Sequence, residues 1–227
     1  MNVEAVYQHF YRVGRLAAEE LSDGGGPFGF DITTALEVDW LIETYGCDAL
    51  FETGCNMGDT TAYLCRRYPA LPLFSCDVKP QYVEATRRRV SGRSNAFVEE
   101  LDSPELIARH AGDFRFPFFY LDAHWYEDWP LERELARIER GVVMVDDFDI
   151  GHPRFGFDEY QGQRCGPELL ARFRAKISRY YTNNPDALYE FPCLQTGRRG
   201  GKAYFLVGEE RDYLRHCRYF LRREFAP

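Results

Sequence analysis

The sequence lacks the features that mark several classes of protein. It contains no apolar run near the roughly 20 residues that a membrane-spanning helix needs, so we expect no membrane partner. Its seven cysteines are an odd number without CxxC spacing, and no charged and apolar leader opens the chain, which favours free thiols in a reducing cytoplasm. Positive charge is scarce, because 28 lysines and arginines stand against 36 acids. With a net charge of -8, we expect no binding to nucleic acid.

The chain is large enough for one substantial core. Of its 227 residues, 45% are hydrophobic and 16% aromatic, which favours a single domain over two independent ones. Residues 1–26 are predicted to form an N-terminal helix and a Gly-rich linker, and residues 27–227 the domain itself. The apolar stripe of that helix leaves two roles open, part of a lid or the face of a homodimer. Short arginine runs, such as Arg87–Arg89 and Arg198–Arg199, are interpreted as solvated faces.

Strand-like and helical patterns alternate through the middle of the chain. We predict strands at Ala49–Glu52, Leu73–Asp77, Ala96–Glu99, Phe118–Asp122 and Val142–Asp146. Helical patterns between them indicate an α/β, doubly wound fold with a mostly parallel sheet. Beyond it the patterns predict a helix over Pro167–Tyr181, an antiparallel hairpin of Leu188–Cys193 and Ala203–Val207, and a last helix over Glu209–Arg223. The sheet would then have seven strands.

The turn after the first predicted strand, ETGCNMGDTT at positions 52–61, lies where open α/β sheets bind ligands. A dinucleotide-binding turn would carry three glycines as GxGxxG, but only Gly54 and Gly58 are present. Asp59 adds a carboxylate where a pyrophosphate prefers neutral amides. The turn therefore favours a ligand with a positive group over an anion.

Asp77 ends the second predicted strand about 20 residues past the turn, where a ribose hydroxyl pair lies in this architecture. A ribose without a diphosphate, joined to a positive group, fits S-adenosylmethionine. Together with Leu101-Asp102-Ser103 and the terminal hairpin, these features resemble the class I S-adenosylmethionine-dependent methyltransferases. The resemblance covers most of the chain from about Asp48 to Val207.

The resemblance implies a set of cofactor-binding residues. By it, Glu52, Gly54 and Gly58 would shape the methionine pocket, Asp77 would bind the ribose, and Asp102 with Ser103 would edge the adenine. The complete predicted set is Glu52, Gly54, Cys55, Asn56, Gly58, Asp59, Thr60, Asp77, Val78, Asp102, Ser103 and Asp122.

Acids also end two later strands, in YLDAHW and VVMVDDFD. If those strands are neighbours in a parallel sheet, their ends lie about 5 Å apart. Three crowded carboxylates need a proton or a cation between them, and a hard divalent ion is the common solution. Asp122, Asp146 and Asp147 are therefore the predicted metal ligands.

We call these three acids the acidic rim. Their arrangement resembles that in the metal-dependent O-methyltransferases of the catechol and macrolide-sugar types, in which such acids bind Mg²⁺ and the ion binds the acceptor's oxygens. The likeness implies a hydroxylated small-molecule acceptor, such as a sugar or natural product with neighbouring hydroxyls. His124, which is near Asp122 in the sequence, is the first candidate for a general base. Asp122, His152 and Asp149 are the further catalytic candidates. The chain has Trp125 and Asp147 where the catechol type has a lysine and an asparagine.

A segment without helical or strand period follows, from Phe148 to Gly166. Loops this long are usually functional or disordered. We predict a substrate lid, and a surface excursion packed by its own aromatics is the alternative.

Other functions remain open at this point. They are a metal-independent methyltransferase acting on nitrogen, carbon or oxygen, a nicotinamide-dependent oxidoreductase, and a noncatalytic nucleoside-binding protein.

Overall fold

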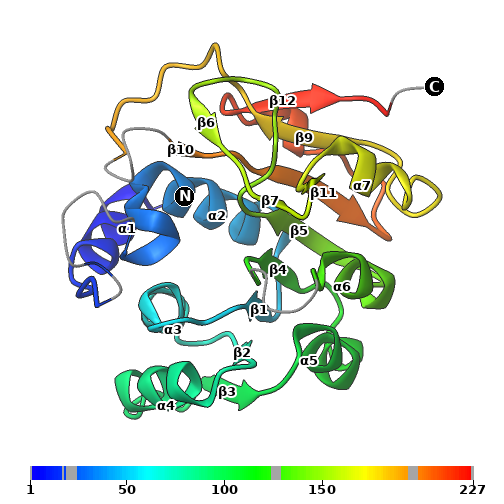
Figure 1. Ribbon diagram of the computed structural model, residues 1–227. Helices are drawn as coiled ribbons and strands as arrows, with labels where there is room; N and C mark the ends of the chain where they lie inside the picture. Colours follow the sequence, from blue (N-terminus) through cyan, green and yellow to red (C-terminus); the bar gives the residue numbers. More distant parts are fainter. Residues whose placement is uncertain (1, 17, 19–24, 124–128, 194–198, 226–227) are drawn as a thin grey trace.

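The computed structural model describes residues 2–16, 18, 25–123, 129–193 and 199–225 of the chain. Within these residues eight strands form one sheet (Figure 1). In spatial order they are β12 (Phe220–Arg223), β9 (Tyr180–Asn183), β11 (Ala203–Val207), β5 (Gly141–Val145), β4 (Phe118–Leu121), β1 (Leu50–Thr53), β2 (Leu73–Asp77) and β3 (Ala96–Glu100).

Strands β1 to β5 are parallel, and β11, β9 and β12 continue the sheet by antiparallel pairing. The predicted α/β, doubly wound and mostly parallel fold is confirmed, but the sheet has eight strands and not the predicted seven. The chain winds outward in both directions from β1, with β2 on one side and β4 on the other. The carboxyl ends of β1 and β4 therefore flank the point at which ligands bind in such sheets.

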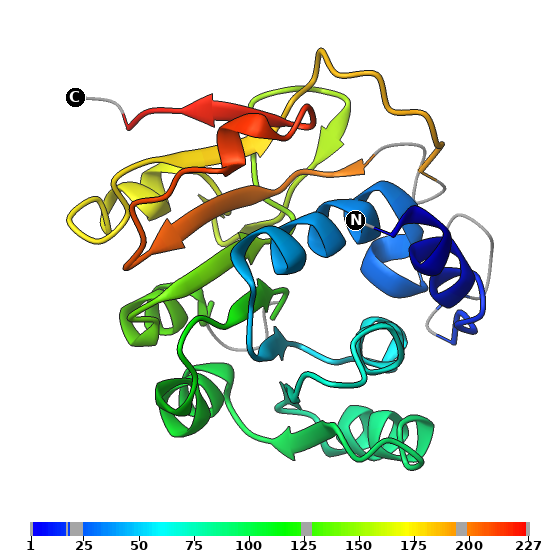
Figure 2. The same ribbon diagram turned by 180° about the vertical axis from the view of Figure 1, so that it is seen from behind.

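Helices cover both faces of the sheet (Figures 1 and 2). One face packs against α1 (Val3–Phe10), α2 (Ile32–Tyr45), α3 (Asp59–Arg67) and α4 (Pro80–Arg89), and the other against α5 (Ser103–His110), α6 (Leu131–Arg137) and α7 (Pro167–Ala171). Short 3₁₀ turns are η1 (Pro27–Phe30), η2 (Ala111–Asp113) and η3 (Leu214–His216).

Strand β5 shows why these strands are apolar throughout. Val142 and Met144 join the core on one face, while Val143 and Val145 join the core on the other. Successive side chains of a strand point to opposite faces, so a strand covered on both faces needs an apolar residue at every position. The covered sheet places polar residues at the strand ends.

The N-terminal helix is part of the main core. Val6 and Phe10 of α1 are fully buried, and the Phe10 ring contacts Phe30 and Tyr63. Val6 and Phe10 of the apolar stripe are therefore covered while Val3 is exposed, and the lid and homodimer roles of the helix stay predictions.

The end of the chain differs from the prediction. The expected helix over Pro167–Tyr181 ends at Ala171, and Tyr180 already begins β9. The expected last helix is wrong, because η3 and β12 occupy that segment. Aromatic and β-branched residues of β9 pair with β11 on one side and β12 on the other, and this tertiary pairing overrides a helical pattern.

The predicted strand over Leu188–Cys193 is also absent from the described structure, and Leu188 is exposed. β9 supplies the missing strand beside β11. The joint residues 194–198 of the expected hairpin lie outside the described residues. No helix in the described part of the chain is both long and apolar enough to cross a membrane.

Candidate active site

The glycine turn after β1 fits closely between two neighbouring segments. Gly54 has a φ of 78°, and a Cβ built there would lie 2.7 Å from the backbone oxygen of Asp122. Gly58, the N-cap of α3, has a φ of 73°, and its Cβ would lie 2.8 Å from the Thr86 hydroxyl. Only glycine meets both requirements, a left-handed backbone and close approach. The turn is thereby pressed against the end of β4 and against α4.

Glu52 is a buried carboxylate with neutral partners. Its Oε2 accepts hydrogen bonds from Thr61 Oγ1 at 2.5 Å and Ser75 Oγ at 2.7 Å. Burial raises the pKa of Glu52 to about 7, although these bonds oppose the rise. The ion pairs among the described residues do not include Glu52. A cationic group of a ligand would therefore stabilise its charged form.

Asp77 ties the turn to the end of β2. Its carboxylate accepts from the backbone N–H of Asn56 at 3.1 Å and of Lys79 at 3.0 Å. The Thr86 hydroxyl in turn donates to the Asn56 carbonyl. Asp77 is thus fixed beside the turn, and its binding of a ribose stays a prediction.

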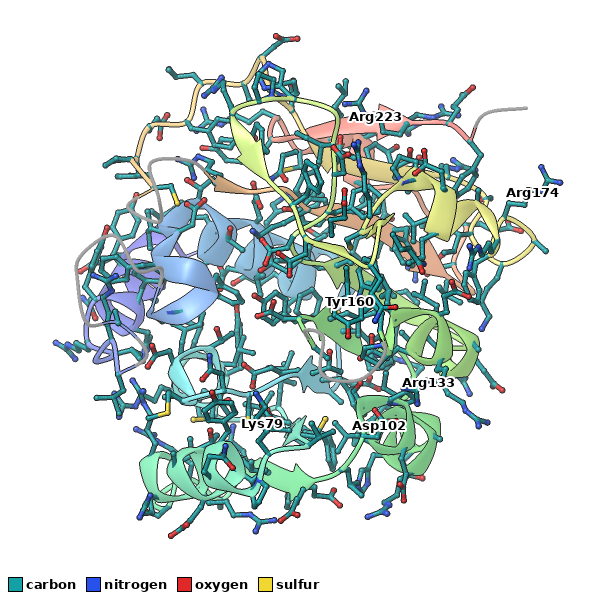
Figure 3. The ribbon with its side chains drawn as sticks, viewed as in Figure 1. Lys79, Asp102, Arg133, Tyr160, Arg174 and Arg223 are labelled. Carbon is teal, nitrogen blue, oxygen red and sulfur yellow. The ribbon has the colours of Figure 1, made fainter. Side chains whose placement is uncertain are left out.

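The residues predicted to edge an adenine lie farther along the same end of the sheet. Asp102 pairs with Arg133 of α6, as Figure 3 shows. Ser103 is buried at the start of α5, and Val78 is exposed after β2. Their cofactor contacts stay predictions.

Asp59 has a different role from the one inferred from its position. Its carboxylate accepts from the backbone N–H groups of Leu16 and Gly26 and pairs with the Arg89 guanidinium. Arg89 is therefore an internal partner and not part of a solvated face. Because Arg89 pairs with Asp59, the carboxyl groups at the turn without an ion pair to Arg89 are those of Glu52 and Asp122.

The acids of β4 and β5 meet as predicted. Leu121 pairs with Val145 in the sheet, so the residues that follow lie side by side. The buried Tyr120 hydroxyl contacts Asp122 Oδ2 at 2.9 Å and also Asp146 Oδ2. Burial and these two carboxylates raise the pKa of Tyr120 well above its ordinary value. Tyr120 is therefore a neutral phenol that lies between Asp122 and Asp146, and its single O–H can donate to one of them at a time.

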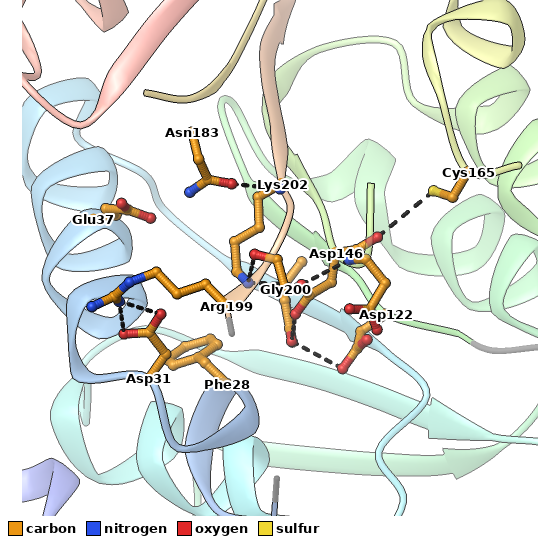
Figure 4. A network of polar contacts seen from close by, with 12 residues as sticks. Phe28, Asp31, Glu37, Asp122, Asp146, Cys165, Asn183, Arg199, Gly200 and Lys202 are labelled. Carbon is orange, nitrogen blue, oxygen red and sulfur yellow. Dashed lines mark hydrogen bonds and ion pairs between the residues drawn. The ribbon is translucent and has the colours of Figure 1, made fainter. Parts of the chain in front are cut away.

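Lys202 is the functional candidate that sequence reasoning missed. It precedes β11, is 2% exposed, and places Nζ 2.8 Å from Asp146 Oδ1 and 3.2 Å from the Gly200 carbonyl (Figure 4). Burial acts to lower the pKa of Lys202, but Asp146 raises it above the ordinary lysine value. Burial acts to raise the pKa of Asp146, and Lys202 lowers it below the ordinary value. Both groups are charged.

A compositional signal for Lys202 was available. Only three of the 28 basic residues are lysines. A chain that uses arginine almost everywhere keeps a lysine at this position, which follows two glycines and begins an apolar strand. The compact ammonium is the cation that fits a crowded space.

The carboxylates of the rim do not fit a divalent ion as they stand. Asp146 Oδ1 accepts from Lys202 Nζ and from the backbone N–H of Asp147, and its Oδ2 contacts Tyr120. Asp122 Oδ2 also contacts the Tyr120 hydroxyl. In the part of the chain that is described, no group of three or more His, Cys, Asp or Glu side chains is arranged to hold a metal. The prediction of Mg²⁺ is not confirmed.

The predicted bases are placed as follows. His124 lies outside the described residues. Asp149 accepts from the Gly151 N–H and pairs with Arg164, and His152 Nδ1 accepts from the Arg154 N–H. These contacts hold both side chains within their own loop. Their catalytic roles stay predictions.

The segment from Phe148 to Gly166 folds back on itself. It contains β6 (Phe155–Gly156), which pairs with β10 (Arg199–Gly200), and the small hairpin of β7 (Glu159–Tyr160) and β8 (Gln163–Arg164). Phe155 is buried, and the Asp158 N–H donates to the Asp147 carbonyl. The segment is therefore anchored to the acidic rim. Its function as a lid stays a prediction.

A single cavity of about 240 Å³ joins the glycine turn to the acidic rim. Its lining includes Glu52, Gly54, Cys55, Asn56, Asp59, Thr60, Tyr120, Asp122, Asp146, Asp147, Lys202 and Phe28. The Phe28 N–H donates to the Thr60 hydroxyl, and the Phe28 carbonyl accepts from the N–H of Asp31. The Asp31 carboxylate in turn pairs with buried Arg199 (Figure 4). Arg199 is thus buried and paired, which corrects its interpretation as solvated.

Three residues of the cavity wall have strained backbones. Phe28, Asn56 and Asp147 have φ values of 53°, 45° and 46°. Left-handed backbone at non-glycine residues costs free energy and clusters at functional sites. The strain, together with a cavity that contacts both the glycine turn and the acidic rim, marks this space as the candidate active site.

The strand order and the helices on both faces of the sheet give the chain the fold of several solved methyltransferases. Among solved structures, the chain is similar to a candidate O-methyltransferase from Klebsiella pneumoniae, with 14% identity over 91% of this chain and 90% of the other and a TM-score of 0.55. It is similar to the N-methyltransferase NodS from Bradyrhizobium japonicum in complex with S-adenosyl-L-homocysteine, with 15% identity, 90% and 100% coverage and a TM-score of 0.52.

A third similar structure is a candidate caffeoyl-CoA O-methyltransferase from Staphylococcus aureus, with 12% identity, 92% and 93% coverage and a TM-score of 0.53. Identities this low establish the fold alone. No protein-family model and no curated protein matched the chain.

Proposed function

We propose that the protein is an S-adenosylmethionine-dependent methyltransferase that methylates a hydroxyl oxygen of a small, uncharged molecule. The observation that carries this proposal is the single cavity shared by the glycine turn and the acidic rim. A methyl donor bound at the turn would have its sulfonium directed toward an acceptor at the rim. The NodS complex with S-adenosyl-L-homocysteine supports a nucleoside ligand for this fold.

The turn fits the donor by charge and by shape. The glycines allow the backbone to approach a ligand closely, and Glu52 offers a buried carboxylate to a cationic amino group. S-adenosylmethionine supplies an electrophilic methyl on a cationic sulfur. Transfer is an in-line displacement, so the contribution of the protein is mostly positioning of the two reactants.

The rim favours a neutral acceptor. The rim brings three carboxyl groups, those of Asp122, Asp146 and Asp147, together with one ammonium, that of Lys202, so it disfavours an anionic acceptor. Hydroxyl groups can donate to these carboxylates. A sugar or natural-product scaffold with neighbouring hydroxyls fits this chemistry. The reaction could proceed with or without a divalent metal, and the contacts of Asp146 favour the metal-independent reaction.

A methyl-transfer assay tests the proposal. Metal-stripped protein, tritium-labelled S-adenosylmethionine, and a panel of catechol, neutral sugars and simple amines would be incubated with and without EDTA. We expect label in a hydroxylated acceptor that persists with EDTA. Label in amines alone would favour the nitrogen methyltransferase, and binding of NADH in place of the nucleoside would favour the oxidoreductase.

A further inference from the structure

The charges of the acidic rim converge on one point beside Gly200. A Cβ built at Gly200 would lie 2.9 Å from Asp147 Oδ1, 3.2 Å from Asp146 Oδ1 and 3.3 Å from Lys202 Nζ. The absence of a side chain at Gly200 is therefore what lets two carboxylate oxygens and one ammonium gather there. This is the arrangement of a bound cation, with Lys202 as the cation.

Several contacts hold the ammonium in place. Lys202 belongs to a rigid segment, because its backbone N–H donates to Asn183 Oδ1 at 2.6 Å and the next residue begins β11. An ammonium has three N–H donors, and the contacts described for Nζ are Asp146 Oδ1 and the Gly200 carbonyl. Lys202 also lines the cavity. One donor can therefore be directed at a ligand there.

We propose that the Lys202 ammonium takes the place of a divalent cation at the acidic rim and donates a hydrogen bond to the acceptor oxygen that attacks the methyl group. The hydrogen bond to the acceptor oxygen rests on the proposed function. The replacement of a divalent cation by Lys202 rests only on the geometry of Asp146, Asp147 and Gly200. It makes Lys202 a catalytic residue.

The reaction balances without a metal. The acceptor's O–H bond breaks, and its proton passes to the carboxylate of Asp147, whose Oδ1 borders the same space beside Gly200 as Lys202 Nζ. The acceptor oxygen forms a bond to the methyl carbon while the carbon–sulfur bond breaks, and that electron pair remains on sulfur. The products are a methyl ether, S-adenosylhomocysteine and a protonated carboxyl. The positive charge near the oxygen stabilises the developing alkoxide.

Titration with Mn²⁺, followed by electron paramagnetic resonance, tests whether Lys202 excludes a metal. We expect no saturable binding of millimolar Mn²⁺ to the wild type. Lys202→Ala should gain one site, because three acids lose their internal cation and a space opens. The matched control is Lys176→Ala, which removes a lysine that bonds the carbonyls of Leu135 and Ala136 away from the cavity.

Two results of this titration would overturn the proposal. One is Mn²⁺ binding by the wild type that Asp146→Asn removes. The other is a folded Lys202→Ala protein that still binds no Mn²⁺. If Lys202→Ala does not fold, the paired change Lys202→Met with Asp146→Asn removes both charges together. That protein should fold, bind no Mn²⁺ and lack activity, whereas full activity would contradict a role for the ammonium.

The methyl-transfer assay gives the second readout, with the acceptor from the panel above that accepts label. Lys202→Met should lower kcat by about 100-fold or more, as loss of one preorganised donor does, while the Kd for S-adenosylmethionine changes little. An unchanged kcat would refute the catalytic role. Failure of the wild type to bind S-adenosylmethionine would refute the proposed function instead, and it would leave the Mn²⁺ result standing.

Discussion

The two halves of the cavity handle buried carboxylates in opposite ways. At the glycine turn, Glu52 is held by neutral hydroxyls, and burial raises its pKa to about 7. At the rim, the Asp146 side chain is also largely buried, but Lys202 lowers its pKa below the ordinary value. This difference indicates that the glycine turn relies on a ligand to supply a positive charge, whereas the acidic rim contains its own cation, Lys202.

Removing the carboxylate that pairs with Lys202 is expected to have the largest effect on the free energy of unfolding. Asp146→Ala leaves Lys202 buried without its carboxylate partner, and breaking such a pair costs about 3–5 kcal/mol. Urea denaturation should show this loss in the free energy of unfolding. Lys202→Met with Asp146→Asn should recover most of it. If Asp146→Ala costs no more than a surface substitution, the ammonium is not held as described.

The glycine-turn half predicts a pH dependence of stability. The folded pKa of Glu52 is raised from 4.5 to about 7, so the folded state binds more protons than the unfolded state between these values. Stability is therefore full below pH 4.5 and falls as pH rises through about 7, by about 3 kcal/mol for this group.

Glu52→Gln isolates that contribution. Glu37 and Glu134 have pKa values raised to about 8 and about 7 and give slopes of the same sign. The measured quantity is therefore the difference in free energy of unfolding between the wild type and Glu52→Gln at several pH values. A difference that does not change with pH would show that Glu52 is not buried with its proton.

The close approach of the turn predicts a contrast between two glycines. Gly54 and Gly46 both have positive φ, but only Gly54 has backbone atoms of another segment within reach of a Cβ. Gly54→Ala should cost about 3 kcal/mol from strain and overpacking, and Gly46→Ala about 1 kcal/mol from its left-handed backbone alone. Thermal unfolding compares them. Equal costs would place the turn farther from β4 than described.

Asp77 gives the smallest of these expected effects. Its loss removes the predicted ribose contact and the hydrogen bond to the Asn56 N–H, which should weaken S-adenosylmethionine binding by about 30-fold or more. Lys176→Ala is the comparison, because Lys176 bonds the carbonyls of Leu135 and Ala136 away from the cavity. Isothermal titration of both variants decides whether Asp77 is the ribose ligand.

Local features were predictable from the sequence. The strand before ETGCNMGDTT, its two glycines and the meeting of Asp122 with Asp146 follow from strand periodicity, turn chemistry and parallel order. These depend on residues close in the chain or on the regular geometry of a sheet.

Long-range partners were not predictable in this way. Lys202 meets Asp146 across 56 positions, and Arg89 meets Asp59 across 30. Neither pairing leaves a periodic signal. The helical interpretation of Tyr180 and Phe220 failed for the same reason, because pairing among β9, β11 and β12 decides their conformation.

Calorimetric titration of the metal-stripped wild type with S-adenosylmethionine and S-adenosylhomocysteine tests the central claim most directly. We predict saturable binding of both nucleosides, weakened about 30-fold or more in Asp77→Ala and unchanged in Lys176→Ala. The absence of heat with either nucleoside, from protein shown to be folded, would contradict the assignment of the cavity.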